Sequence, residues 1–481
     1  MTTDQHSFFI DGRWRSPASD RRITVIDAST EEVLGGVPEG QEADIDAAVS
    51  AARRAFDDPT GWSNWEPTAR AEVMRRLADA LDARKDELTR TVCRENGMPM
   101  ALAEVLEGAL PSLLLRYYAD LICATPSEEH RDGLLGRPVI VRREPVGVAA
   151  AIVPWNAPQT LASLKYAPAL AAGATVVLKP SPEAPLDSVF FAEALIEAGV
   201  PDGVINIVPA GREVGAYLVA HPGIDKVAFT GSTAAGRAVA ETCGRLLRPA
   251  TLELGGKSAA IVLEDADLDS EAMQQELFAA TMMNNGQACF ASTRVLAPRS
   301  RYAEVVDAVS SLAESLKVGD PLDPTTQVGP LATARQRDRV EAYIAKGKDE
   351  GSRLTVGGGR PGHLDRGWYV EPTVFADVDN RQVIAQEEIF GPVLVITPYE
   401  DEQDAIRLAN DSDFGLGGSV WTRDAEHGRD IARRIRTGSI GVNHYMSDPI
   451  APFGGVRASG LGREFGPEGL ANYQQLKSIY L

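Results

Sequence analysis

The chain contains little cysteine and little histidine, with four and six residues respectively among 481. The cysteines, at positions 93, 123, 243 and 289, form no Cys-x-x-Cys pair, and no His-Glu-x-x-His motif is present. Disulfide frameworks and zinc sites need such spacings, so we expect neither of them and no catalytic metal. This use of cysteine is typical of a reducing cytoplasm.

A long apolar run and a basic surface are also missing. The most apolar region, 146–178, is interrupted by Pro154, Pro158, Lys165 and Pro168, so it is not a membrane span of about 20 apolar residues. Residues 1–6 lack the basic and apolar segments of a signal peptide. A net charge of −20 disfavours nonspecific binding to nucleic acid or anionic lipid. We therefore expect a cytoplasmic protein that has neither nucleic acid nor a membrane as a partner.

The patterns that are present predict an α/β protein. The predicted strands lie at 146–153, 174–178, 204–208, 226–229 and 251–254. The predicted helices between them end near 171, cover 186–198 and begin at 232. Strands separated by helices indicate a doubly wound parallel sheet, whose ligands bind at the carboxyl ends of the strands.

Further elements are expected on both sides of this region. A hairpin is predicted at 8–14, a helix capped by Asp44, and a helical region from Pro67 to Gly97. A second alternating section begins at 259 and includes a helix at 267–284 and strands at 393–396 and 418–421. The segments 134–143 and 478–481 look like strands outside either sheet, which often pair with a partner subunit.

Cys289 and Glu253 are the first candidates for chemistry. Cys289 follows a polar turn containing Gly286, which suits a reactive thiol, although a buried hydrophobic role is the usual one for cysteine. Glu253 stands between two leucines at a strand end and precedes two glycines. It is either a general base whose pKa is raised by apolar surroundings or part of a buried ion pair with Lys257.

Three further segments follow predicted strands. The segment 229–236, Phe-Thr-Gly-Ser-Thr-Ala-Ala-Gly, opens a helix and suits a phosphate at the helix N-terminus. Lys179 ends a strand, where it either binds a ligand or reaches solvent. Asn156 follows another strand, and its amide suits a developing oxyanion, although a turn also favours asparagine.

Together these segments resemble the aldehyde dehydrogenase superfamily, from about Phe8 to Leu481. The agreeing segments are Pro154-Trp155-Asn156, Lys179-Pro180-Ser181, Phe229-Thr230-Gly231-Ser232, Glu253-Leu254-Gly255-Gly256-Lys257, Gly286-Gln287-Ala288-Cys289, Glu388-Ile389-Phe390-Gly391-Pro392 and Pro452-Phe453-Gly454-Gly455. The resemblance implies a doubly wound, Rossmann-like cofactor domain (1–122 and 146–255) and an α/β catalytic domain (256–457). It also implies a small β oligomerisation domain (123–145 and 458–481) and a homodimer or homotetramer.

The resemblance also implies a mechanism. Cys289 would attack an aldehyde, and Asn156 with the backbone N–H of Cys289 would hold the oxyanion. Hydride transfer to the nicotinamide leaves a thioester, which water activated by Glu253 would hydrolyse. Lys165 and Glu464 match positions proposed to relay protons from Glu253.

The same resemblance assigns cofactor contacts. They are Trp155, Lys179, Ser181, Phe229, Gly231, Ser232, Gly255, Glu388 and Phe390. Many NAD-using members carry a glutamate three residues after the lysine, where this chain has Pro182 followed by Glu183. Since other members with proline here use NAD, we expect NAD, with NADP as the alternative.

The residues that match the family's substrate funnel are Leu161, Leu164, Phe290, His444 and Tyr445. Their mostly apolar character favours an aliphatic or aromatic aldehyde. Two alternatives to a hydrolytic dehydrogenase are a CoA-acylating aldehyde dehydrogenase and a non-catalytic protein on the same scaffold. The presence of Glu253 argues against the first, because CoA-acylating members commonly lack the base.

Overall fold

An eight-stranded sheet organises the first lobe of the computed structural model, which describes residues 3–481. Its strand order is β20-β12-β11-β8-β9-β10-β2-β3. The strands are β2 (Phe8–Ile10), β3 (Arg13–Arg15), β8 (Val148–Ile152), β9 (Thr175–Lys179), β10 (Ile205–Ile207), β11 (Lys226–Thr230), β12 (Ala250–Glu253) and β20 (Gly460–Leu461). The five strands from β8 to β12 run parallel, as the sequence predicts, and β2 and β20 add antiparallel edges.

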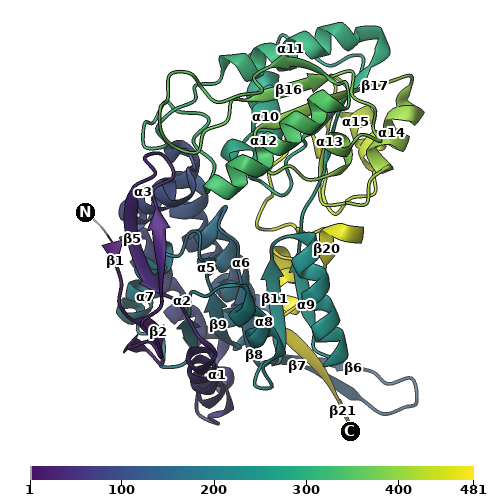
Figure 1. The fold of residues 1–481 in the computed structure, drawn as a ribbon. Coiled ribbons are helices and arrows are strands. Elements are labelled where there is room, and N and C mark those ends of the chain that lie inside the picture. Colours follow the sequence, from purple (N-terminus) through teal and green to yellow (C-terminus); the bar gives the residue numbers. More distant parts are fainter. Residues whose placement is uncertain (1–2) are drawn as a thin grey trace.

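Helices cover both faces of this sheet (Figure 1). They are α1 (Glu42–Asp57), α2 (Pro67–Asp82), α3 (Lys85–Asn96), α4 (Met100–Ala103), α5 (Leu110–Ala124), α6 (Pro158–Ala172), α7 (Asp187–Ala198), α8 (Arg212–Ala220) and α9 (Thr233–Arg245). Alternate residues of β11 enter two separate cores, with Ala228 facing α5 and α6 and Val227 facing α1 and α8. The strands are therefore apolar on both faces, as expected for a covered parallel sheet.

A seven-stranded sheet organises the second lobe, which includes α11 and α12 at the top of Figure 1. The order is β15-β16-β17-β14-β13-β18-β19, and every pair is parallel except β15–β16. The strands are β13 (Ala259–Val262), β14 (Arg294–Pro298), β15 (Arg353–Val356), β16 (Thr373–Ala376), β17 (Val393–Tyr399), β18 (Gly418–Trp421) and β19 (Gly441–Val442). The helices are α10 (Glu271–Thr281), α11 (Tyr302–Ser315), α12 (Ala334–Asp349), α13 (Val383–Gln386), α14 (Glu402–Asn410) and α15 (Ala425–Ala432).

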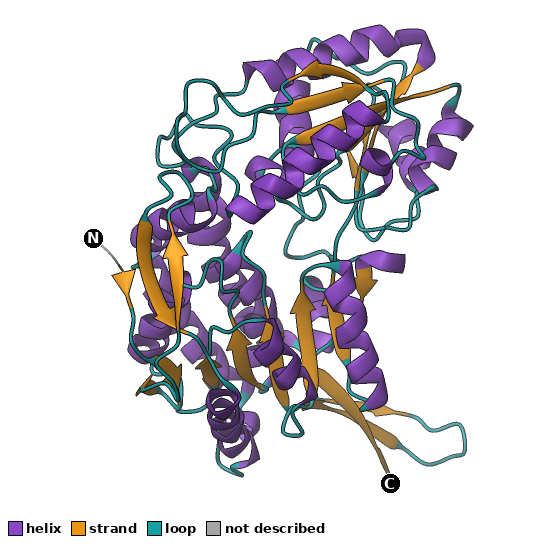
Figure 2. Cartoon of the chain, in the orientation of Figure 1, coloured by secondary structure: helices purple, strands orange, loops and turns teal. Residues whose placement is uncertain are grey.

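Two small sheets complete the fold, and a short helix, α16 (Gly466–Ala471), precedes the last strand. A three-stranded sheet of order β21-β7-β6 projects from the first lobe (Figure 2). Its strands are β6 (Glu128–Arg131), β7 (Val139–Pro145) and β21 (Gln474–Tyr480). The other small sheet has the order β1-β5-β4 and consists of β1 (Thr3–Asp4), β4 (Arg22–Ile26) and β5 (Val33–Pro38). No described helix is long and apolar enough to cross a membrane.

Several predicted boundaries were wrong at element ends. Gln41, not Asp44, caps α1, because Asp44 occupies the third helical position and its carboxylate accepts the Gln41 N–H at 2.9 Å. The predicted strand 134–143 begins only at Val139, since Leu134 and Leu135 lie in the exposed loop after β6. The predicted helix 267–284 is shorter on both sides, because Ser270 caps α10 and its last helical residue is Thr281.

Candidate active site

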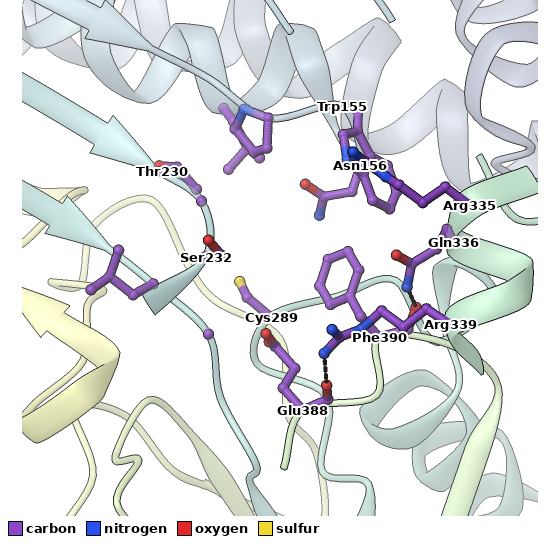
Figure 3. Close-up of a pocket in the computed structure, with 15 residues that line it drawn as sticks. Trp155, Asn156, Thr230, Ser232, Cys289, Arg335, Gln336, Arg339, Glu388 and Phe390 are labelled. Carbon is purple, nitrogen blue, oxygen red and sulfur yellow. Dashed lines mark hydrogen bonds between the residues drawn. The ribbon is translucent and has the colours of Figure 1, made fainter. Parts of the chain in front are cut away.

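A cavity of about 480 Å³ lies between the two lobes (Figure 3). Its walls come from the carboxyl ends of β8, β11 and β12, from the loop before β14 and from α12. The lining residues are Pro154, Trp155, Asn156, Leu161, Thr230, Gly231, Ser232, Leu254, Gly255, Cys289, Arg335, Gln336, Arg339, Glu388 and Phe390. The site therefore lies where the doubly wound sheet is expected to bind its ligand.

Cys289 lies on a tight loop between α10 and β14. Gly286 has a φ of +71°, and a methyl group added there would lie 2.1 Å from the Gly391 carbonyl oxygen, so only glycine fits. The sulfur points into the cavity (Figure 3). Burial raises the pKa of the Cys289 thiol well above its usual value, and the charges of Glu253 and Glu388 add to the rise. This thiol needs a neighbouring base or a bound cationic group to become a thiolate.

Asn156 binds the cysteine loop directly. Its Nδ2 donates a hydrogen bond to the Gln287 carbonyl at 2.9 Å, and its own carbonyl accepts one from Asn284 Nδ2 at 2.9 Å. An amide group carries two N–H donors, so one remains for a ligand in the cavity. The arrangement brings an amide donor and the thiol to the same wall, which suits a developing oxyanion.

Glu253 lies behind this wall at the end of β12 and is only 2% exposed. Neither carboxylate oxygen has a hydrogen-bond partner among residues 3–481. Burial raises the pKa of Glu253 well above its usual value, the charge of Glu464 raises it further, and Lys165 and Arg463 oppose the rise. The ion pair with Lys257, one of the two expected alternatives, is absent from the described residues, since Lys257 Nζ is also without a partner.

Lys165 and Glu464 form a buried pair near Glu253. Lys165 Nζ donates hydrogen bonds to Glu464 Oε1 at 2.8 Å and to Thr230 Oγ1 at 2.6 Å. The lysine is fully buried, and Glu464 is 5% exposed. A cavity-lining residue, Thr230, is thus connected to a pair of ionisable groups inside the first lobe.

Six of the nine expected cofactor residues line the cavity: Trp155, Gly231, Ser232, Gly255, Glu388 and Phe390. Ser232 caps α9 and accepts the Ala235 N–H at 3.3 Å. Glu388 accepts the Gly256 N–H at 3.0 Å, and burial raises the pKa of its carboxyl group to about 7. A methyl group at Gly255 would lie 2.5 Å from Glu388 Oε2. The absence of a side chain at Gly255 therefore lets a ligand approach the backbone closely at this wall of the cavity.

The other three expected cofactor residues do not line the cavity. Lys179 does not reach solvent, because its Nζ is buried and donates to the carbonyls of Pro180 (3.1 Å) and Ala210 (2.5 Å). Burial lowers the pKa of this lysine to about 8. Ser181 Oγ donates to Glu183, and the Phe229 ring lies against Gly231, 2.6 Å from where a methyl group would stand.

Only one of the five expected substrate residues, Leu161, lines the cavity. Phe290 follows the thiol and stacks edge-on against Tyr445, with ring centroids 5.5 Å apart. Leu164 is buried in the core of the first lobe. His444 is exposed, and its Nδ1 lies 2.6 Å from Glu276 Oε2. Leu164, Phe290, His444 and Tyr445 are therefore not among the residues that line this cavity, and their role in a substrate funnel stays a prediction.

Helix α12 supplies cavity residues that sequence reasoning missed. Gln336 Nε2 donates to the Phe390 carbonyl at 2.7 Å, and Arg339 donates to the Glu388 carbonyl at 2.5 Å. These bonds hold Phe390 at a φ of +63°, an uncommon conformation for a residue other than glycine. Arg335 lies beside them at the cavity edge (Figure 3). Nothing in the sequence of α12 distinguishes it from an ordinary polar surface helix.

Comparisons with known proteins agree with this geometry. The chain is 55% identical to geranial dehydrogenase from Castellaniella defragrans, over 100% of both chains. The structure matches a Mycobacterium tuberculosis aldehyde dehydrogenase complexed with NAD+ at a TM-score of 0.97, with 49% identity over 100% of this chain and 99% of that one. It also matches an aldehyde dehydrogenase C mutant from Pseudomonas syringae, in complex with NAD+ and octanal, at a TM-score of 0.94. That match has 41% identity over 98% of this chain and 96% of that one.

The family and the fold expected from the sequence are confirmed by these matches. Residues 14–479 match the aldehyde dehydrogenase family, so the chain belongs to that family.

Proposed function

We propose that the protein oxidises a largely apolar aldehyde to the carboxylic acid with NAD and water. The observation that carries this proposal is the single cavity wall on which Cys289 and Asn156 lie, with the buried carboxylate of Glu253 behind it. Membership of the family makes the chain an NAD(P)-dependent aldehyde dehydrogenase. The substrate class, the roles of individual residues and the preference for NAD are the parts that we propose.

The cavity fits a nicotinamide nucleotide. Gly231 and Ser232 leave the N-terminus of α9 open to a phosphate, and Gly255 lets the backbone approach a ligand beside Glu388. Trp155 and Phe390 pack edge-on beside this space, with ring centroids 5.5 Å apart. The nucleotide, when bound, supplies the hydride acceptor.

The side chains would then divide the remaining chemistry among them. Cys289 gives its thiol proton to a neighbouring base and attacks the carbonyl carbon as the thiolate, and the Asn156 amide with the Cys289 N–H stabilises the oxyanion. After the hydride leaves, the acyl group remains on Cys289 as a thioester. Glu253 takes a proton from water, whose oxygen attacks the thioester, and Lys165 with Glu464 lies beside Glu253 to receive that proton.

Glu183 supports the preference for NAD. Pro182 replaces the glutamate that many NAD-using members carry, but the neighbouring Glu183 accepts a hydrogen bond from Ser181 and pairs with Arg335 at 3.1 Å. The charge of Glu183 opposes the lowering of the Lys179 pKa that burial causes. A carboxylate at this edge of the sheet would repel a 2′-phosphate, and the two similar structures reported above were solved with NAD+.

The apolar walls support an apolar substrate. Leu161 lines the cavity, and Phe290 packs against Tyr445 and Phe453 beyond the thiol. One relative is named geranial dehydrogenase, and another was solved in complex with octanal. Geranial and octanal are both apolar aldehydes. We propose medium-chain aliphatic or terpenoid aldehydes.

The test is the rate of NADH formation with NAD or NADP against octanal, geranial and succinic semialdehyde. We expect kcat/KM to be higher for the two apolar aldehydes by about tenfold or more, since an unpaired charge in an apolar site is costly. Similar values for octanal and succinic semialdehyde would contradict the substrate class. The Cys289→Ser variant is the control for enzymatic NADH formation.

Two further measurements separate the alternatives. A requirement for added CoA would identify a CoA-acylating enzyme, and absence of NADH formation across many aldehydes would identify a non-catalytic protein. We further propose a cytoplasmic homodimer or homotetramer. Its cofactor, catalytic and oligomerisation domains would follow the boundaries given under Sequence analysis.

A further inference from the structure

The two donors proposed to hold the oxyanion come from different lobes. Asn156 follows β8 of the first lobe, whereas Cys289, whose backbone N–H is the other donor, precedes β14 of the second lobe. Donors stabilise an oxyanion well only when they are already fixed at the position where the charge develops. The contacts that join these two segments therefore bear directly on the rate.

A buried asparagine at the end of α3, Asn96, holds the segment that carries Asn156. Its Nδ2 donates hydrogen bonds to the carbonyl oxygens of Trp155 at 3.0 Å and Asn156 at 3.2 Å. Its Oδ1 accepts the Met98 N–H at 3.0 Å, and the residue is fully buried. The amide therefore has a partner for its oxygen and for both of its N–H donors, and both donors end on the backbone beside the cavity.

The residue that follows, Gly97, holds the cysteine loop. Asn285 Nδ2 donates to the Gly97 carbonyl oxygen at 2.8 Å and to the Pro330 carbonyl oxygen at 2.9 Å. Asn285 Oδ1 accepts the Gly329 N–H at 2.6 Å, and this residue is also fully buried. The carboxyl end of α3 thus contacts both segments that supply the oxyanion donors.

We propose that Asn96 is a positioning residue for the oxyanion site, which fixes the backbone of Asn156 to the same helix end that holds the cysteine loop. This inference rests on the proposed function. Asn96 does not line the cavity, so it acts through the segment 155–156 and not on the substrate. An oxyanion forms twice in the proposed reaction, when sulfur adds to the aldehyde and when water adds to the thioester. Loss of the Asn96 hydrogen bonds should slow both additions.

The experiment compares the single-turnover rate of NADH formation, with octanal and NAD, in Asn96→Ala, Asn156→Ala and the double variant. The amplitude counts the competent sites, and the rate is expressed per site. A displaced amide donor should lower this rate by about tenfold in Asn96→Ala, with KM for octanal within about twofold of the wild-type value. In the Asn156→Ala background the same change should alter the rate by less than about twofold, because the donor that Asn96 orients is already gone.

The matched control is Asn206→Ala on β10. Asn206 is fully buried, its Nδ2 donates to the Gly203 carbonyl oxygen at 2.8 Å, and its Oδ1 accepts the Asp11 N–H at 3.0 Å. It does not line the cavity. This variant should lower Tm, because it removes an equally buried amide, and should keep the wild-type rate per site.

An unchanged rate per site in a folded Asn96→Ala variant would overturn the inference, as would an equal fold-loss in the Asn156→Ala background. If Asn96→Ala does not fold, Asn285→Gly decides, since glycine adopts the φ of +59° found at this position without strain and removes the hydrogen bond to Gly97. It should lower the rate per site by a similar factor, and an unchanged rate would refute the inference. Absence of NADH formation by the wild type would instead refute the proposed function, so the two failures are distinguishable.

Discussion

Asn156 anchors the cysteine loop with both its side chain and its backbone. Because its amide is also the side-chain donor nearest the thiol wall, we predict that Asn156→Ala lowers kcat by about 10²–10³-fold, the usual cost of losing an oxyanion donor. The measurement is the single-turnover rate of NADH formation. Asn64→Ala, an exposed change far from the cavity, should leave that rate unaltered, and an active Asn156→Ala variant would argue against the oxyanion role.

The buried carboxyl group of Glu253 should determine how kcat depends on pH. The group must be ionised to take a proton from water, and burial raises its pKa well above 4.5. Turnover should therefore fall as the pH drops through this raised pKa and should level off above it. The Glu253→Gln variant should lose about 10²–10⁴-fold in steady-state kcat and show no such dependence. A profile of kcat that is flat from about pH 5 to 9 in the wild type would contradict the assignment.

Gly256 packs closely against the backbone of the loop that carries the Cys289 thiol. A methyl group there would lie 2.4 Å from the Cys289 carbonyl oxygen, which is backbone and cannot rotate away. We predict that Gly256→Ala displaces the cysteine loop and abolishes the NADH burst. The control is Gly244→Ala on α9, where nothing lies within 4 Å. It should keep activity and raise the free energy of unfolding by up to about 1 kcal/mol, measured by urea titration.

At the scale of elements, the projecting sheet offers an apolar edge. Leu476 and Tyr480 of β21 are 68% and 80% exposed, on a strand with only one partner strand, β7. If the proposed homo-oligomer forms through this strand, the double change Leu476→Lys and Tyr480→Lys should dissociate it, since charges on such an edge prevent strand pairing between subunits. Molar mass from light scattering measures this. Val105→Lys, at an exposed position of the first lobe, should have no effect, and an unchanged mass in the double variant would place the interface elsewhere.

Sequence patterns located the core strands better than the element ends. The strand β18 was predicted with its observed bounds, because an apolar run buried on both faces gives a clear signal. The ends of α10 and the start of β7 were missed, since caps and loop geometry depend on tertiary contacts. Arg335, Gln336 and Arg339 could not be found, because their role depends on where α12 packs, more than 40 residues from Cys289 along the chain. Leu164 and His444 do not line this cavity, and their place in a substrate funnel stays a prediction, because proximity in sequence to Leu161 and Tyr445 does not fix which way a side chain points.

At the scale of the whole molecule, buried carboxyl groups tie stability to pH. Glu107 is 1% exposed, and burial raises its pKa from 4.5 to about 7. Between these values the folded chain holds a proton that the unfolded chain releases, so stability falls as the pH rises from about 4.5 to 7. We predict that Glu107→Gln makes Tm less dependent on pH in this window, measured by calorimetry at several pH values. Parallel Tm profiles for the two proteins would refute this.

The contact between Gly286 and Gly391 bears on the range of substrates that the site can accept. Gly286 touches the backbone of Gly391, so the loop that carries the sulfur and the loop that carries Phe390 cannot separate without breaking this contact. Moving either loop aside to admit a bulkier aldehyde would therefore lose this packing. Side-chain volume at positions such as Phe290 and Leu161 is the less disruptive way to change the breadth of accepted molecules, and redesign should begin there.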